Sequence, residues 1–263
     1  MKNMEQANEK TANETDKKLK VIVIFIAYKA VKTLESFYTS FPKNLADEII
    51  LVDDASGDGT FELSQKLGIT SFKNPVNLGY GGNMKRAIEI ALSRGADVIV
   101  DIHPDGEYKP SAIPAALEKV RNGAGLVLGN RFTTLSKPLE SGMYSWKIIP
   151  IVAMNTFDRF ALGVPVHDLH QGFRVYTRKL LESVNYTANT NGYLFSFELI
   201  AEAKFKKIPI AEVPVETNYT GEKRGASLKN SLKYSFATFK VLALYYGAKL
   251  GFVSEIFKNP AQK

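Results

Sequence analysis

The stretch "VIVIFIA" (Val21–Ala27) decides the fold class, because it is a run of apolar residues without one polar position. Such a run is typical of a strand that is buried on both faces, as strands are in parallel sheets covered by helices. A segment with helical spacing follows at Val31–Ser40, and a second apolar strand follows at 48–54 ("EIILVDD"). The order strand, helix, strand predicts a βαβ unit.

The same alternation continues through the first half of the chain. It predicts helix 60–67, strand 69–72, a helix opened by the glycines at 79–82, strand 97–102, helix 111–122 and strand 125–129. We therefore expect an α/β fold with a doubly wound, mostly parallel sheet of Rossmann type, flanked by helices. In such sheets ligands bind beyond the carboxyl ends of the strands.

The second half is less regular. Its predicted elements are helix 143–162, a strand running into a helix over 172–181 ("GFRVYTRKLL"), helix 193–205, a strand over 208–217 and helix 228–246. The prolines in 208–217 fit an edge strand, because proline cannot donate to a sheet ladder.

The composition of the chain indicates its cellular compartment and the character of its two terminal segments. The 263 residues include no cysteine, which excludes disulfides and thiolate metal sites and is consistent with a reducing compartment. Residues 1–18 are polar and mixed in charge, so we expect a flexible leader, no signal peptide and a cytoplasmic location. Residues 223–263 carry eight basic residues against Glu255 alone, which accounts for the whole net charge of +7.

That basic segment contains an amphipathic helix. On a helical wheel one face holds Leu228, Leu232, Phe236, Phe239, Leu242 and Tyr246, with Lys229, Lys233 and Lys240 beside it. The apolar run 241–248 is far shorter than the roughly 20 residues of a membrane-spanning helix. The pattern favours peripheral contact with an anionic membrane surface, with a core-packing helix as the alternative. No nucleic-acid-binding motif accompanies the basic residues, so we expect no nucleic-acid partner.

Two carboxylates end the second predicted strand, in "VDDASGDGT" (52–60). Asp53 and Asp54 could accept hydrogen bonds from a ribose or from a base N–H, or they could cap the following turn. A dinucleotide-binding site would need Gly-x-Gly-x-x-Gly in the turn after the first strand. That turn reads "IAYKAVK", without glycine, which argues against an NAD site.

A glycine cluster opens the next helix, in "NLGYGGNMKRAI" (77–88). Gly79, Gly81 and Gly82 precede Lys85 and Arg86 on that helix. Glycines allow close approach to the backbone and a helix N-terminus favours anions, so the cluster could bind phosphate. An ordinary glycine turn is the alternative.

The stretch "DIHPDGEYKP" (101–110) places four ionisable residues at alternate positions: Asp101, His103, Asp105 and Glu107. Alternate residues of an extended chain share one face. Oxygen ligands on a tight turn suit a hard cation such as Mg²⁺ or Mn²⁺, which can bridge a diphosphate. His103 would suit Mn²⁺ better than Mg²⁺. The alternative is a polar strand end.

The chain closely resembles the family 2 glycosyltransferases, which have the GT-A fold. The resemblance is carried by the stretches above in their sequence order, followed by "GNRF" (129–132), "DLHQGFRVY" (168–176) and "GYLFSFELIAEA" (192–203). Within them the chain looks most like the dolichol-phosphate mannose synthase group. The resemblance runs from about residue 20 to residue 240. It implies a GT-A domain over 19–222, followed by the basic helical segment over 223–263.

For the nucleotide, the resemblance points to the first two motifs. Asp53 matches the family's base- and ribose-binding aspartate, with Asp54 as its neighbour. Tyr28 is what survives of a Pro-x-Tyr-Asn-Glu motif, whose last two positions are lysine and alanine here. We add Gly79 and Lys85 as nucleotide-binding candidates. The donor, a UDP- or GDP-sugar, stays open.

For the metal, the resemblance points to the third motif. Asp105 matches the second acid of the family's Asp-x-Asp motif, which holds a divalent cation, Mg²⁺ or Mn²⁺, on the donor diphosphate. His103 replaces the first acid, and Glu107 stands where the family often has glutamine. The expected metal ligands are therefore Asp105, His103 and Glu107.

The resemblance implies a metal-dependent, inverting transfer of a hexose to a polyprenyl (dolichyl or undecaprenyl) phosphate. Arg131 and Arg174 match residues that handle donor and acceptor phosphates, and Asp168 matches an acid upstream of Arg174. With Asp105 these are the expected catalytic residues. A phosphate acceptor needs no strong base, whereas a glycan hydroxyl would need one, with Asp168 or Glu198 as candidates.

Two alternatives to that function stay open. One is a soluble glycosyltransferase that acts on a glycan hydroxyl in polysaccharide synthesis. The other is a non-catalytic nucleotide-sugar or membrane-binding module, favoured by the altered "IAYKA" and "HPD" motifs.

Overall fold

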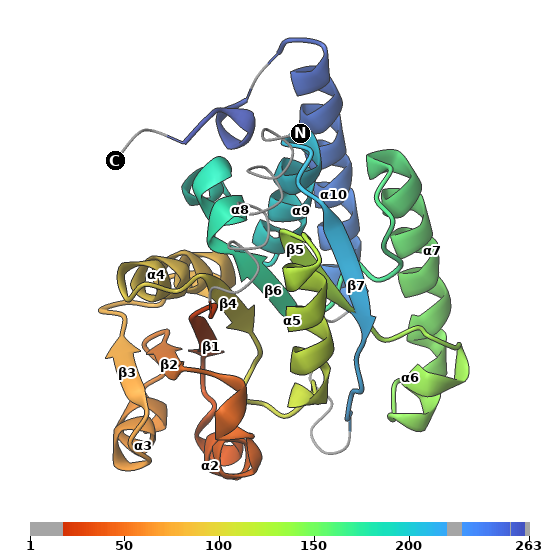
Figure 1. The fold of residues 1–263 in the computed structure, drawn as a ribbon. Coiled ribbons are helices and arrows are strands. Elements are labelled where there is room, and N and C mark those ends of the chain that lie inside the picture. The colour runs from red at the N-terminus through yellow and green to blue at the C-terminus, as the bar shows by residue number, and fades with distance from the viewer. Residues whose placement is uncertain (1–17, 220–227, 253, 261–263) are drawn as a thin grey trace, which may run out of the picture.

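The computed structural model describes residues 18–219, 228–252 and 254–260, so nearly all of the expected leader lies outside it. Its centre is a seven-stranded sheet with strand order β3-β2-β1-β4-β6-β5-β7 (Figure 1). The strands are β1 (Val21–Ala27), β2 (Glu48–Asp53), β3 (Thr70–Lys73), β4 (Val98–Asp101), β5 (Leu126–Asn130), β6 (Arg174–Thr177) and β7 (Ile210–Pro214). Only β6, among these strands, runs against its neighbours.

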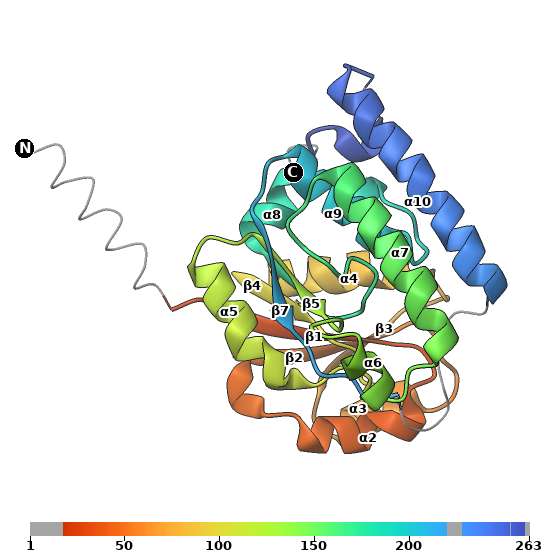
Figure 2. The ribbon, with the colours of Figure 1, turned by 90° about the vertical axis from the view of Figure 1, so that its right-hand side faces the viewer.

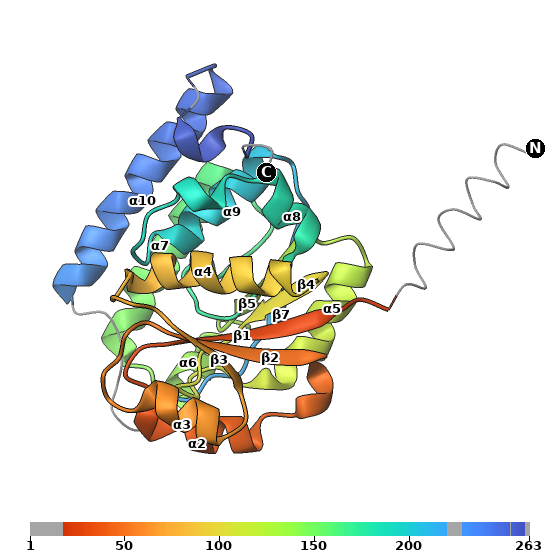
Figure 3. The same ribbon diagram turned by 90° about the vertical axis from the view of Figure 1, so that its left-hand side faces the viewer.

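Helices cover both faces of the sheet. They are α2 (Val31–Ser40), α3 (Thr60–Lys66), α4 (Gly79–Ser93), α5 (Ile113–Arg121), α6 (Ser136–Glu140), α7 (Ser145–Leu162), α8 (Arg178–Ser183), α9 (Phe195–Phe205) and α10 (Leu228–Lys249). Helices α4, α9 and α10 share one apolar core with the sheet, while α2 and α5 share the other (Figure 3). The predicted doubly wound α/β fold is confirmed.

The first strand shows why the sequence predicted this arrangement. All seven residues of β1 are buried, because β1 lies between β2 and β4 and under helices on both faces. The edge strand predicted over 208–217 is present as β7, but it is shorter, Ile210–Pro214, and it pairs in parallel with β5.

The antiparallel direction of β6 is a finding that the sequence pattern did not contain. It places Arg174, the first residue of β6, opposite Asp101, the last residue of β4. The parallel strands β1, β2, β4 and β5 end at this same edge of the sheet. Residues that follow these strands, and the start of β6, therefore meet at one edge.

Helix α10 packs on α9 by part of its apolar surface only. Val241, Leu242 and Tyr245 are buried, whereas Phe236 and Phe239 are exposed. Of the predicted apolar face, Leu242 is buried and Phe236, Phe239 and Tyr246 are exposed, while the side chains of Leu228 and Leu232 lie outside the described residues. Within the described residues, no helix is both long enough and apolar enough to cross a membrane.

Candidate functional site

The two carboxylates after β2 both bind backbone at the carboxyl edge. Asp53 Oδ2 accepts a hydrogen bond from Ser56 N at 3.2 Å, and Oδ1 accepts one from the Ser56 hydroxyl. Asp54 accepts from Leu78 N at 2.8 Å and from Gly79 N at 3.0 Å. A carboxylate at the free N–H groups of a helix start is favourable, so Asp54 fixes the start of α4.

The glycines of α4 are required by a neighbouring segment of the chain. Gly81 N donates to Asn191 O at 2.7 Å. A Cβ on Gly81 would lie 2.3 Å from Thr190 O, and one on Gly79 would lie 2.7 Å from Asn191 O. Lys85 Nζ donates to Asn191 Oδ1 at 2.9 Å. The glycines therefore allow the chain around Asn191 to close over the helix start.

The segment 189–194, which we call the α4 loop, brings an exposed aromatic ring to the site. Thr190 donates from its N (2.7 Å) and its hydroxyl (3.0 Å) to Glu198, which anchors the loop. The exposed Tyr193 ring lies 5.1 Å from the Tyr80 ring, which lies 5.8 Å from the His103 ring. The sequence reasoning missed both tyrosines, although each follows a glycine in a turn motif.

Tyr28 lies just beyond β1 and is half exposed at the same edge. Its neighbour Lys29 has a φ of 55°, and Lys29 N donates to Ser56 Oγ at 2.8 Å. Ser56 also binds Asp53, so the turn after β1 and the turn after β2 are joined. The structure thus brings Tyr28 and Asp53 together.

The turn after β4 presents two carboxylates. Asp105 and Glu107 are half-buried, and Asp105 Oδ1 accepts a hydrogen bond from Glu107 N at 2.9 Å. Burial raises the pKa of Glu107, although the nearby Arg131 opposes this shift. His103 points its Nε2 toward Asp101 Oδ1, at 3.6 Å.

The donor set of this turn fits a hard divalent cation. Among the described residues no three His, Asp or Glu side chains converge into a ready-made metal cage. Mg²⁺ and Mn²⁺ sites on diphosphates commonly use one or two carboxylates and take further ligands from phosphate and water. Asp105 and Glu107 supply such carboxylates, while Nε2 of His103 faces the buried Asp101.

Arg131, which follows β5, is locked by Asp168. Its Nε donates to Asp168 Oδ2 at 2.7 Å and its Nη2 donates to Oδ1 at 2.9 Å, a two-point pairing. Asn155 donates to Asp168 Oδ1 and Tyr219 accepts from Arg131 Nη1. Burial acts to raise the pKa of Asp168, but Arg131 outweighs it and holds that pKa below its usual value. The sequence reasoning missed Asn155 and Tyr219.

Arg174 and Asp101 form a second buried cluster, with Tyr176 and His103 beside them. Both Asp101 oxygens, Arg174 Nε and the Tyr176 hydroxyl find no hydrogen-bond partner among the described residues. Burial raises the pKa of Asp101, against the opposing effects of His103, Arg174 and the adjacent Tyr176 hydroxyl. Arg174 donates weakly to Leu169 O at 3.5 Å.

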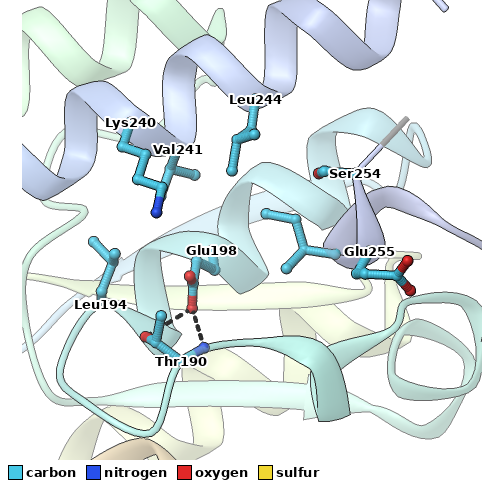
Figure 4. A pocket seen from close by; sticks show the side chains of 9 residues that line it. Thr190, Leu194, Glu198, Lys240, Val241, Leu244, Ser254 and Glu255 are labelled. Carbon is cyan, nitrogen blue, oxygen red and sulfur yellow. Dashed lines mark hydrogen bonds between the residues drawn. The ribbon is translucent and has the colours of Figure 1, made fainter. Parts of the chain in front are cut away.

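A pocket of about 230 Å³ lies between α9 and α10, beside the α4 loop, whose Thr190 and Leu194 help to line it (Figure 4). Glu198 and Lys240 point into it, and Leu194, Val241 and Leu244 form much of its wall. Figure 4 shows Glu198 already accepting both hydrogen bonds from Thr190. Burial raises the pKa of Glu198.

The predicted site residues differ in how accessible they are. At the carboxyl edge of the sheet Tyr28 is half exposed and Asp105 and Glu107 are half-buried, whereas Asp53 is buried and bound to Ser56. Asp54, Gly79 and Lys85 hold α4 and its loop. Arg131, Asp168 and Arg174 are buried below the edge, within the protein.

Comparison with known proteins identifies relatives of this chain. The family model described as glycosyl transferase family 2 matches residues 22–184. The polyprenol monophosphomannose synthase of Mycolicibacterium smegmatis is 29% identical over 201 residues, which cover 73% of this chain and 74% of that protein. The undecaprenyl-phosphate mannosyltransferase of Micrococcus luteus is 28% identical over 211 residues, covering 75% and 83%.

A solved structure has the same fold. It is glucosyl-3-phosphoglycerate synthase from Mycobacterium tuberculosis, in complex with Mn²⁺, UDP and glucosyl-3-phosphoglycerate. The TM-score is 0.67 and the match covers 89% of this chain and 82% of that one, at 20% sequence identity.

Proposed function

This chain belongs to glycosyl transferase family 2, and from that premise we propose that it transfers a hexose from a UDP- or GDP-sugar to a polyprenyl phosphate, with inversion at the anomeric carbon. The chain is a glycosyltransferase with a GT-A type fold, as its motifs predicted. The names of the relatives from M. smegmatis and M. luteus support a polyprenyl phosphate as the acceptor.

The observation that carries the proposal is the placement of Asp105. It lies in the turn after β4, at the edge where Tyr28 follows β1 and Asp53 ends the neighbouring strand β2. A nucleotide held by Tyr28 and Asp53 would extend its diphosphate toward the β4 turn, because β1 lies between β2 and β4. Ligands of doubly wound sheets bind beyond this edge.

We assign the cation to Asp105, with Glu107 as its neighbour, and expect Mg²⁺ or Mn²⁺. When bound, the cation would neutralise charge on the leaving diphosphate. His103 would support the turn from behind, since its Nε2 faces Asp101. Burial raises the pKa of Glu107, and a bound cation would act in the opposite direction and favour its ionised form.

In the proposed reaction an acceptor phosphate oxygen forms a bond to the anomeric carbon while the bond from that carbon to the nucleoside diphosphate breaks. The acceptor oxygen is already anionic, so no side chain has to remove a proton. Arg131 and Arg174 are buried within the protein, so we assign them a long-range electrostatic role beneath the phosphates, in which Asp168 offsets much of the Arg131 charge. Asp168 would act as a positioning residue for Arg131.

A glycan hydroxyl acceptor is the weaker candidate, because it needs a free base. Of the two expected bases, Asp168 is bound by Arg131 and Asn155. Glu198 accepts two hydrogen bonds from Thr190 and faces the pocket of Figure 4.

A lipid-linked acceptor requires the enzyme to work at a bilayer surface. We propose that α10 contacts the cytoplasmic face of the membrane peripherally, through Phe236, Phe239 and Lys233. These side chains are exposed, as interfacial contact demands.

The test is a transfer assay with UDP- and GDP-sugars, with Mg²⁺, Mn²⁺ or a chelator, and with a short prenyl phosphate or a soluble glycan as acceptor. We expect turnover with the prenyl phosphate that requires the cation. Asp105→Asn should lower it at least about a hundredfold, because a neutral amide replaces the negatively charged carboxylate that would hold the cation. Glu118→Gln, an exposed carboxylate on α5, is the control and should be unchanged.

The remaining outcomes decide against the proposal. Transfer only to the glycan would favour the hydroxyl acceptor. Nucleotide-sugar binding by thermal shift without any turnover would indicate a binding module. Full metal-dependent activity in Asp105→Asn would remove the assigned cation site.

A further inference from the structure

Large exposed apolar side chains gather on two helices. Fifteen such side chains are exposed among the described residues, and nine of them lie on α7, on α10 or directly after α10. The nine are Trp146, Ile149, Phe157, Phe160, Phe236, Phe239, Tyr246, Leu250 and Phe252. Ile149 is 77% exposed and Phe160 is 74% exposed, so α7 contributes as strongly as α10.

The two helices lie side by side, so their exposed residues form one surface (Figure 2). The Phe157 and Phe239 rings are 5.1 Å apart. Tyr246 donates from its hydroxyl to Ala161 O at 2.5 Å. We call this surface, made of the nine residues above, the α7–α10 face. An apolar face of this extent on a soluble domain marks an interaction site.

Basic groups lie directly beside the exposed rings. Lys147 Nζ is 5.4 Å from the Trp146 ring, and Lys249 Nζ is 5.6 Å from the Tyr246 ring. The one acid in the sequences of the two helices is Asp158. Asp158 is buried and faces His170 Nε2 at 2.9 Å, so neither helix exposes a carboxylate. The face therefore combines apolar rings with positive charge only.

We propose that the α7–α10 face is a membrane-docking surface that inserts its rings at the acyl boundary of an anionic bilayer, with α7 as an equal partner of α10. Aromatic and aliphatic residues flanked by lysines are the composition of interfacial helices. A second copy of this chain would be a poor occupant, because a two-fold interface would set the same lysines and Arg159 against each other.

The same docking would turn the reaction edge toward the lipid headgroups. Tyr234, near the start of α10, places its hydroxyl 3.1 Å from His170 Nδ1. Before α7, Tyr219 N donates to Ser141 O at 2.8 Å, and the Tyr219 hydroxyl accepts from Arg131. The amino ends of both helices thus adjoin the buried arginines. This orientation rests on the proposed lipid-phosphate acceptor, but the docking itself does not.

Trp146 is the single tryptophan of the chain, lies on this face and is 53% exposed. Its fluorescence in the full chain therefore reports insertion directly. We expect its emission to shift to shorter wavelength with phosphatidylglycerol vesicles, to be quenched by brominated acyl chains, and to change little with phosphatidylcholine vesicles. No nucleotide sugar is present, so this result and the transfer assay fail or succeed separately.

Paired variants test the share of each helix. Ile149→Gln with Phe160→Gln on α7, and Phe236→Gln with Phe239→Gln on α10, should each weaken vesicle binding at least tenfold in co-sedimentation. Val76→Gln, an exposed apolar residue before α4, is the control and should change binding less than twofold. Circular dichroism and thermal melts establish that each variant is folded.

Three results would overturn the proposal. The first is wild-type protein that neither sediments with anionic vesicles nor shifts its emission. The second is a stable dimer in light scattering that the α7 variant dissolves, which would make a second copy the occupant. The third is normal vesicle binding by the α7 variant, which would leave docking to α10 alone.

Discussion

Arg131 with Asp168 and Arg174 with Asp101 are two buried arginine–aspartate neighbours below the same edge of the sheet. In the first pair two nitrogens of the guanidinium meet both carboxylate oxygens, at 2.7 and 2.9 Å. In the second pair both carboxylate oxygens and the arginine Nε are without hydrogen-bond partners among the described residues. The two pairs consist of the same residue types and are similarly buried. The polar atoms of the first pair are hydrogen-bonded, whereas most of those of the second pair are not.

The difference follows from how each pair is brought together. Asp168 and Arg131 come from irregular segments, which can adjust until the side chains meet in two-point geometry. Asp101 and Arg174 are fixed opposite each other by the β4–β6 register, which sets the backbone spacing and leaves the side chains little freedom. A satisfied pair supports the scaffold, whereas unsatisfied groups are costly unless they serve the site.

The largest expected effect comes from breaking the satisfied pair. Arg131→Met leaves Asp168 buried and charged without its partner, and we expect a loss of about 3–5 kcal/mol in the free energy of unfolding. Urea denaturation measures it. Arg121→Met, exposed on α5, should change stability by no more than about 0.5 kcal/mol. A loss below about 1 kcal/mol in Arg131→Met would mean that the pair does not support the scaffold.

A second, smaller effect is the pH dependence of stability, which we expect to differ in sign between Asp168 and Asp101. The pKa of Asp168 is lowered, so the stability it contributes is present above its unfolded pKa and is lost as pH falls through the folded value. The pKa of Asp101 is raised by burial, so its cost is absent at low pH and grows as pH rises above the unfolded value.

The stability lost in Asp168→Asn should therefore be about 2–3 kcal/mol at neutral pH and should shrink on acidification below about pH 4. The loss in Asp101→Asn should instead be largest at acid pH and should shrink as pH rises. Urea denaturation of wild type and both variants from pH 3.5 to pH 7.5 gives these differences. Parallel slopes for the two variants would contradict the contrast between the pairs.

The sequence predicted what is local or periodic. The apolar runs of β1 and β5 and the helical spacing of α2 predicted those elements. The spacing of apolar residues along a short segment shows which of its side chains are buried. The direction of β6 could not be predicted that way, since its partners lie far along the chain. The same holds for Tyr219, which binds Arg131 across 88 residues of sequence.

The sequence predicted where the site residues lie in the fold, but not which side chains contact one another there. Asp53 and Asp105 were placed at the carboxyl edge because parallel strands end together. The bond of Asp54 to α4 depends on how the 74–79 turn folds back, for which the sequence left both a ligand and a capping role open. The burial of Arg131 and Arg174 depends on long-range packing, which their short motifs do not encode.

The smallest effect compares one hydroxyl from each cluster. Tyr219→Phe removes the acceptor of Arg131 Nη1, which lies at 3.2 Å, and we expect a loss of about 1 kcal/mol. Tyr176→Phe removes a buried hydroxyl that lies beside Asp101 and lowers the pKa of that carboxyl but makes no hydrogen bond of good geometry among the described residues, so stability should stay within about 0.5 kcal/mol of wild type or rise slightly. The two changes delete the same atom from the same residue type, so each variant is the control for the other. Equal losses by urea denaturation would mean that the Tyr176 hydroxyl is as well bonded in solution as that of Tyr219, and the contrast between the clusters would fail at this position.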